Sequence, residues 1–328
     1  MNFSQIRPVA DEALEGRIRR RLDSLTKPRG SLGRLEELAL QAGLIQASEE
    51  PAIRDPAMVI FCADHGIVEE GVSPYPAEVT RQMVANFRSG GAAITVLCRH
   101  YGIRPVIVDM GVGRPTRNFA REPAMTREQA KASIEEGARH ADSGDVLGAG
   151  EMGIGNSTAA AALLSAFSGL DPAETCGRGT GLDDAGVAHK AEVIGRALKL
   201  HRLDASDPVG VLAAVGGFEI GGIVGLILGS ARRRRVVVLD GFISCSAALV
   251  ARAMAPAALD YVVFSHRSAE RGHWRMLEFL GARPLFDLDM RLGEGTGAAL
   301  GINLLQAAVK IYREMATFES AGVSTAEV

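Results

Sequence analysis

The sequence has few aromatic residues and no excess of charge of one sign. Aromatic side chains make up 5% of its 328 residues, and 36 basic against 39 acidic residues leave a net charge of −3. Nucleic acids and anionic membranes attract basic proteins, so this balance argues against both as partners. With 47% hydrophobic and 23% charged residues, the chain has the composition of a globular protein.

Cysteine is scarce and widely spaced. The four cysteines, Cys62, Cys98, Cys176 and Cys245, form no CxxC pair, which argues against a zinc site and against a disulfide framework. The first twenty residues contain no long apolar stretch and do not resemble a signal peptide. Together these features predict a reduced, cytoplasmic setting.

One run, residues 209–231, is apolar enough to suggest a membrane span. Glu219 lies at its centre, where a charge costs about 2.5–3.5 kcal/mol in a membrane helix. Arg232–Arg235 follow the run, as positive charge flanks many membrane spans. The run also contains seven glycines, and after the arginines comes VVVLDG, a pattern typical of a strand. We therefore favour two short buried helices that lead into a strand.

Glycine, by contrast, is abundant: 38 residues, about 12% of the chain, against a usual ~7%. The glycines follow no Gly-X-Y period and proline is not enriched, which excludes a collagen-like or low-complexity chain. Glycine used locally marks backbone that turns sharply or approaches another group closely. The excess therefore predicts a ligand site.

Five short apolar runs predict strands, and segments with helical spacing separate them. Strands that alternate with helices indicate parallel βαβ units. We therefore predict an α/β fold with a doubly wound, mostly parallel, Rossmann-like sheet. The predicted strands are Ala57–Ala63, Pro105–Met110, Asp145–Ala149, Arg235–Leu239 and Tyr261–Phe264. The predicted helices are Ala77–Phe87, Ala92–Tyr101, Arg127–Asp142, Ser157–Phe167, Asp183–Leu200, Gly222–Ala231 and Ser246–Ala255.

Both ends of the chain lack strand patterns. Residues 10–48 predict two helices around the turn TKPRGSLG, and Thr296–Glu319 predicts one long helix. We expect a smaller helical domain formed from both termini, residues 1–49 plus 291–328, beside a large Rossmann-like domain of residues 50–290.

Polar or glycine-rich loops follow the predicted strands, and such loops meet at one edge of a parallel sheet, where ligands bind. In the richest loop, GAGEMGIGNST, four glycines precede Asn156 at the start of a helix, an arrangement suited to a phosphate. Gly148–Gly153 also fits GxGxxG, which would indicate a dinucleotide-dependent oxidoreductase, although Glu151 would repel a pyrophosphate. Tight strand–helix packing without a ligand is a third reading.

Two further loops carry charged residues next to glycine. GRGTGLDD (177–184) precedes a helix with Asp183 or Asp184 as its N-cap, and Lys190 on that helix either meets an anion or, as we favour from its position alone, lies in solvent. Glu294 stands between Gly293 and Gly295 just before a helix. It either caps that helix or serves as a general base in a cleft whose apolar walls raise its pKa.

A metal site is a weaker hypothesis. Asp and His residues follow several strands, and Asp287-x-Asp289 resembles the DxD of metal-dependent sugar transferases. The histidines have neither HxxxH nor HxH spacing.

Taken together, these loops resemble one enzyme family. The stretches ADHGIVEEGVSPYPAEVTRQMVANFRSGGAAI, GEMGIGNSTAAAALL, GRGTGLDD, LDGFISCSAAL, SHRSAERGH and LGEGTGAALGINLLQAA are similar to those of nicotinate-nucleotide–dimethylbenzimidazole phosphoribosyltransferases. The resemblance runs from TKPRGSLGRLEELA (26–39) to the C-terminal helix. It implies transfer of the phosphoribosyl group of nicotinate mononucleotide to 5,6-dimethylbenzimidazole, a step in cobalamin synthesis. It also implies a homodimer and no metal or organic cofactor.

The resemblance assigns roles to single residues. Glu294 matches the catalytic carboxylate, which would take a proton from the base. The residues that match the nucleotide site are Gly150, Glu151, Gly153, Gly155, Asn156, Lys190, Gly241 and Ser268. Those expected in the base pocket are Ser73, Tyr75 and Gln82. A protein that binds the nucleotide without turning it over is a non-catalytic alternative.

Overall fold

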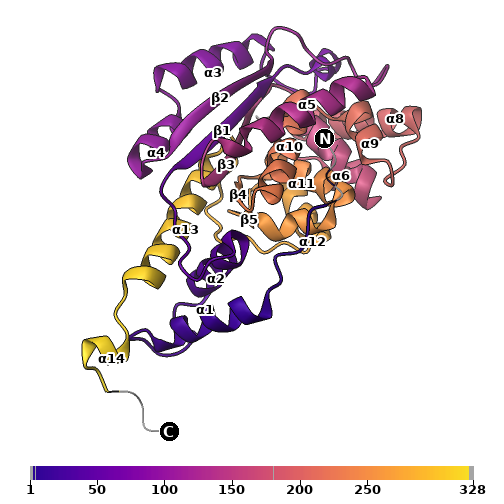
Figure 1. The fold of residues 1–328 in the computed structure, drawn as a ribbon. Helices are drawn as coiled ribbons and strands as arrows, with labels where there is room; N and C mark the ends of the chain where they lie inside the picture. Colours follow the sequence, from indigo (N-terminus) through magenta and orange to yellow (C-terminus); the bar gives the residue numbers. More distant parts are fainter. Residues whose placement is uncertain (1–2, 4, 180, 325–328) are drawn as a thin grey trace.

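The computed structural model describes residues 3, 5–179 and 181–324 and centres on a parallel sheet (Figure 1). The strand order is β2-β1-β3-β4-β5, and all four neighbouring pairs are parallel. The five predicted strands are confirmed; their bounds are β1 Pro56–Ala63, β2 Arg104–Gly111, β3 Val146–Met152, β4 Val236–Leu239 and β5 Val262–Phe264.

Helices cover both faces of the sheet, which explains the apolar strands. All eight residues of β1 are buried. Because side chains alternate along a strand, Phe61 and Met58 point to opposite faces. Phe61 contacts Gly222 in helix α10 (Phe218–Arg232), whereas Met58 packs beside the start of helix α13 (Thr296–Glu314) at Gly295. The doubly wound α/β prediction is confirmed.

The other helices follow the predicted order. Helices α3 (Glu78–Ser89) and α4 (Ala93–Tyr101) connect β1 to β2, and α5 (Arg127–Arg139) connects β2 to β3. After β5 comes α12 (Arg271–Leu280), a helix that the sequence analysis did not predict. Between β3 and β5 lie α6 (Asn156–Ser168), α7 (Pro172–Thr175), α8 (Asp184–His201), α9 (Pro208–Val215), α10 and α11 (Phe242–Met254).

The apolar run 209–231 forms two helices, α9 and α10, which meet at Gly216 and Gly217. A Cβ added at Gly225 would lie 1.9 Å from the carbonyl oxygen of Ile134 in α5, so glycine here allows close helix packing. Among the described residues, no helix is both long and apolar enough to cross a membrane.

The two terminal segments of the chain form helices, as predicted, and these helices lie together. Helix α2 (Arg34–Gln46) lies beside α13, and α1 (Glu12–Ser24) packs on α2. Helix α13 runs from the sheet toward the short helix α14 (Phe318–Ala321) (Figure 1). The apolar core continues without a break from the sheet into α1 and α2. The division into domains at residues 50 and 290 stays a prediction.

The long C-terminal helix predicted to reach Glu319 ends at Glu314, so that boundary is wrong. Met315 is extended, and Leu25 and Thr317 form an antiparallel bridge that turns the chain away from the helix axis. Thr317 then starts α14 with a capping box. A contact with the N-terminal segment, which helical spacing does not encode, sets the end of the helix.

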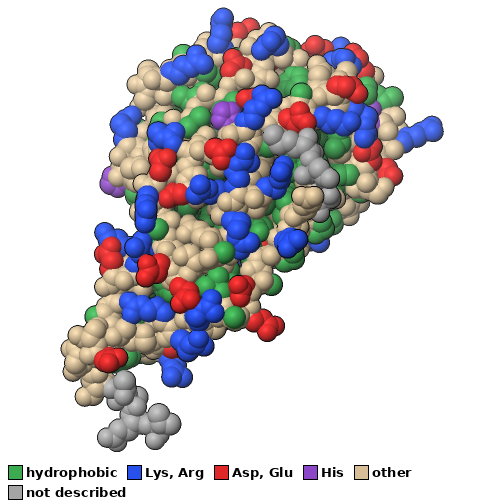
Figure 2. All heavy atoms as spheres, in the orientation of Figure 1, with side chains coloured by type: hydrophobic (Ala, Val, Ile, Leu, Met, Phe, Trp, Pro, Cys, Tyr) green, Lys and Arg blue, Asp and Glu red, His purple; other side chains and the backbone are tan. Residues whose placement is uncertain are grey.

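Charges of both signs are mixed over the face seen in Figure 2, where blue and red side chains alternate. Many charged side chains of the surface form ion pairs, for example Arg127 with Asp207.

Candidate active site

A cavity of about 650 Å³ opens at the carboxyl edge of the sheet. Its walls come from the segment after β1, the loop after β3 and the loop before α13. In the strand order 2-1-3-4-5, chain connections diverge at β1 and β3, the point where doubly wound sheets bind ligands. The lining residues are Val72, Ser73, Tyr75, Val79, Met83, Glu151, Met152, Gly153, Ile154, Gly155, Asn156, Ser157, Gly179, Ile243, Glu270, Arg291, Leu292 and Glu294.

The loop after β3 is shorter than the glycine pattern predicts. β3 continues to Met152, so Gly148 and Gly150 lie within the strand and only Gly153 and Gly155 lie in the turn. The dinucleotide interpretation of GxGxxG fails, since that motif needs its first two glycines in the loop. Gly155 has φ +94° and precedes α6, whose first residues Asn156 and Ser157 line the cavity.

Glu294 does not cap the helix that follows it. Gly295 is the N-cap of α13, and the carboxylate of Asp240 accepts hydrogen bonds from the backbone N–H groups of Gly295 and Gly297 at 2.9 and 2.7 Å. Glu294 instead lines the cavity, is 6% exposed, and its Oε2 has no hydrogen-bond partner among the described residues. The capping alternative is therefore wrong.

The surroundings of Glu294 favour its neutral form. Burial raises the pKa of Glu294 to about 7, the backbone N–H of Ile94 in α4 opposes this rise, and the charge of Asp240 adds to it. A carboxyl group with a pKa near the working pH accepts protons efficiently while still being partly ionised. The raised pKa, the unpartnered oxygen and the position in the cavity wall make Glu294 a candidate general base.

This raised pKa predicts a pH dependence. The base must be ionised to act, and a raised pKa moves ionisation to higher pH, so kcat/KM should rise tenfold per pH unit below about pH 7 and level off above it. Steady-state rates between about pH 5.5 and 8.5 test this. A flat profile over that range would show that Glu294 does not titrate in the reaction.

Glu151 lies directly beside this group. Its Oε1 accepts a 3.3 Å hydrogen bond from the backbone N–H of Glu294, and its Oε2 accepts one from the side-chain amide of Asn156. Burial, together with the charges of Asp240 and Glu219, raises the pKa of Glu151 to about 8. A carboxyl group that is mostly neutral at pH 7 does not repel an anionic ligand.

Lys190 is 1% exposed, so its placement in solvent was wrong. Its Nζ donates a 2.9 Å hydrogen bond to Oγ of Ser157 at the start of α6. Burial lowers the pKa of Lys190, while the nearby Cys176 and Glu270 oppose that shift. Helix α8 begins after Asp183, the N-cap, so the second turn of α8 carries Lys190 behind the cavity wall.

The remaining predicted residues divide into two groups. Ser73 and Tyr75 line the cavity together with Glu151, Gly153, Gly155 and Asn156. Gly150 lies just behind the wall, where an added Cβ would come within 2.3 Å of the carbonyl oxygen of Glu294. Gly241 and Ser268 are not in the wall; both lie near His266.

Gln82 is also outside the cavity wall. It is exposed on α3, while Val79 and Met83 on the same helix line the cavity. These two residues are four apart and share one helix face, whereas Gln82 is rotated by about 100° from Met83. The i, i+4 spacing of these two apolar residues is the sequence pattern that indicated which face of α3 lines the cavity.

Glu270 and Arg291 were missed by the sequence analysis. Both line the cavity, and burial raises the pKa of Glu270, whose Oε2 has no hydrogen-bond partner among the described residues. Glu270 lies six residues after the end of β5 and Arg291 lies three residues before Glu294, so proximity to strand ends and to the base was the only signal.

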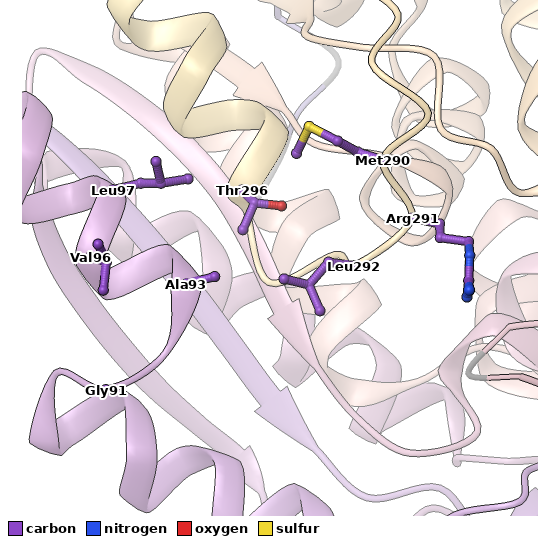
Figure 3. A pocket seen from close by; sticks show the side chains of 8 residues that line it. All are labelled: Gly91, Ala93, Val96, Leu97, Met290, Arg291, Leu292 and Thr296. Carbon is purple, nitrogen blue, oxygen red and sulfur yellow. The ribbon is translucent and has the colours of Figure 1, made fainter.

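A second, apolar groove adjoins the cavity (Figure 3). Ala93, Val96 and Leu97 of α4 lie on one side of it, and Leu292 and Thr296 on the other (Figure 3). Arg291 points away from α4, and Arg291 and Leu292 line both the groove and the cavity.

The acidic and histidine residues of the metal hypothesis form separate pairs rather than one cluster, and Asp240 pairs with His266. Asp287 pairs with Arg267 at the surface, and His65 pairs with Glu219 at 2.7 Å in the interior. Within the described ranges, no group of three or more His, Cys, Asp or Glu residues is arranged to hold a metal ion.

The parallel α/β sheet thus brings a buried carboxyl group and the N-terminus of α6 into the wall of one cavity. A family model described as "Phosphoribosyltransferase" matches residues 7–323, and the chain belongs to that family. It is 52% identical to the nicotinate-nucleotide–dimethylbenzimidazole phosphoribosyltransferase of Chloroflexus aggregans, over 98% of this chain and 97% of the relative. The enzyme of that name from Cupriavidus necator is also 52% identical, over 99% of each. The crystal structure of CobT from Thermus thermophilus superposes with a TM-score of 0.91 at 44% identity, covering 96% of this chain and all of that one.

Proposed function

We propose that the protein transfers the 5-phosphoribosyl group of nicotinate mononucleotide to 5,6-dimethylbenzimidazole, giving α-ribazole 5′-phosphate and nicotinate. The observation that carries the proposal is Glu294, a buried carboxyl group with one unpartnered oxygen in the wall of a cavity. The names of relatives about half identical over nearly their whole length give the substrates.

Two parts of the cavity suit the two substrates. The start of α6 is the positive end of that helix, and there Asn156 and Ser157, with Lys190 behind them, suit a phosphate. Glu151 lies between that end and Glu294, where the ribose would sit. The flat aromatic base would fit among the apolar side chains of Val72, Val79, Met83, Ile243 and Leu292, with Ser73 and Tyr75 beside them.

The reaction needs one base and no acid. The Glu294 carboxylate takes the proton from one imidazole nitrogen, and the other nitrogen attacks C1′ of the ribose from the face opposite nicotinate. As the new C1′–N bond forms, the bond to nicotinate breaks and its electron pair neutralises the pyridinium ring. Because this leaving group departs without a proton, a single carboxylate suffices where glycoside hydrolysis uses two. Binding both substrates in line lowers the barrier further.

The setting of the enzyme is part of the proposal. We expect a homodimer in the cytoplasm, built from a catalytic domain at residues 50–290 and a helical domain from both termini. Exposed apolar side chains at Val96 and Leu288, outside the cavity wall, support self-association.

Release of nicotinate tests the proposal. The purified protein should release nicotinate from nicotinate mononucleotide only when dimethylbenzimidazole is present. The apolar pocket holds the flat aromatic base in line with C1′, and it does not hold a water molecule there. Nucleotide binding without turnover would indicate the non-catalytic alternative, and release without any base would indicate a hydrolase. Adenine and unsubstituted benzimidazole serve as competing bases in the same assay.

A further inference from the structure

The backbone of Glu294 has an uncommon conformation. Its φ is +65°, in the left-handed region that a side chain with a Cβ rarely adopts, between Gly293 at +82° and Gly295 at +100°. Such a conformation persists only where the surroundings enforce it, and it is found mostly at functional sites. The groups that hold this loop therefore also hold the base.

Asp240 is the main anchor of the loop. Its side chain is 1% exposed at the end of β4, and its two oxygens accept hydrogen bonds from Gly295 and Gly297, the first and third residues after Glu294. Hydrogen bonds to a charged acceptor are about twice as strong as neutral ones. The carboxylate thus fixes the loop to the rigid sheet across 55 residues of sequence.

His266 holds Asp240 in place. Its Nε2 lies 3.3 Å from Asp240 Oδ1, it is buried, and its ring stacks on Phe286 with centroids 5.8 Å apart. A Cβ at Gly297 would lie 2.2 Å from the His266 ring and 2.6 Å from Asp240 Oδ1. Glycine at this position lets the carboxylate reach the loop.

Ionisable groups approach Glu294 from several elements. Glu151 comes from β3, Asp240 follows β4, Glu270 precedes α12, and Arg291 belongs to the same loop as Glu294. Of these, Asp240 and Glu151 accept hydrogen bonds from the backbone of the loop, and Asp240 holds two of its amides.

We propose that Asp240, supported by His266, is the positioning residue of the general base: it enforces the left-handed turn that holds the unpartnered oxygen of Glu294 at the cavity wall. This inference rests on the proposed function. Asp240 does not itself touch the substrates; it acts through the loop that carries Glu294.

The test is Asp240→Asn, a change of equal size. The uncharged amide accepts from only one of the two backbone amides and turns its NH₂ toward the other, so kcat should fall about 10- to 100-fold. The KM for nicotinate mononucleotide should change less than about threefold, since Asp240 does not line the cavity. Loss of the nearby negative charge should move the acidic limb of the kcat/KM profile to lower pH.

Two further variants separate positioning from folding. In the Glu294→Gln background, Asp240→Asn should add little to the loss, because both changes act through the same base. Asp287→Asn, which removes an exposed surface carboxylate, should leave kcat and the pH profile unchanged. If Asp240→Asn does not fold, His266→Gln should give a smaller fall in kcat with KM preserved.

Wild-type kcat with an unshifted limb in Asp240→Asn would overturn the inference, as would additive losses in the double variant. Absence of transferase activity in the wild-type protein would instead overturn the proposed function, so the two failures are distinguishable.

Discussion

Replacing Glu294 by glutamine is expected to lower kcat by about 10²- to 10⁴-fold, the usual contribution of a positioned general base. Glutamine keeps the size of the side chain but cannot take the proton from the attacking imidazole. The measurement is single-turnover conversion of bound nicotinate mononucleotide, which reports the chemical step without product release.

The fold should tolerate this change. Burial raises the pKa of Glu294, so the ionised form is unfavourable there and a neutral amide removes that cost. The thermal midpoint of Glu294→Gln should equal or exceed that of the wild type above pH 7, and nucleotide affinity should persist. Turnover within about threefold of the wild type would remove Glu294 from the mechanism.

Replacing Lys190 by methionine is expected to lower kcat/KM for nicotinate mononucleotide by about 10- to 100-fold. A phosphate at the start of α6 would lose the one lysine charge that the described structure places beside Ser157, and Met fills the same buried space. The loss should appear mainly as a higher KM, since the phosphate is bound equally in the ground and transition states.

Lys199→Met is the matched control, because Lys199 lies exposed on the same helix, α8. It should leave KM unchanged. An equal KM in the Lys190 and Lys199 variants would contradict a phosphate site at the start of α6.

Much of the fold could be predicted because local patterns specify it. The apolar run of β1 indicated a buried strand, and the glycines and Glu219 within 209–231 favoured two buried helices over a membrane span; the structure has both features. The position of the cavity could be predicted from the strand ends, because parallel strands bring the loops at their carboxyl ends to one edge of the sheet. Glu294 could be singled out as a candidate cavity residue because glycines flank it, and it lines the cavity.

What the sequence could not predict depends on contacts between distant segments. Asp240, which follows another strand, caps the N-terminus of α13, so Glu294 does not. The sequence around Glu294 gives no indication of this contact. Lys190 looks solvated on its helix but is buried, because segments distant in sequence, among them Ser157 and Gly179, pack against it. The resemblance placed Gln82 in the base pocket, but α3 turns its side chain toward solvent.

The most direct test of the account is the identity of the product formed from nicotinate mononucleotide and dimethylbenzimidazole. We predict one equivalent of nicotinate for each equivalent of a benzimidazole ribotide, with the α configuration at C1′ in the NMR spectrum, because attack comes from the face opposite the leaving group. A β product, a mixture of anomers, or ribose 5-phosphate with free base would contradict in-line transfer by a single carboxylate.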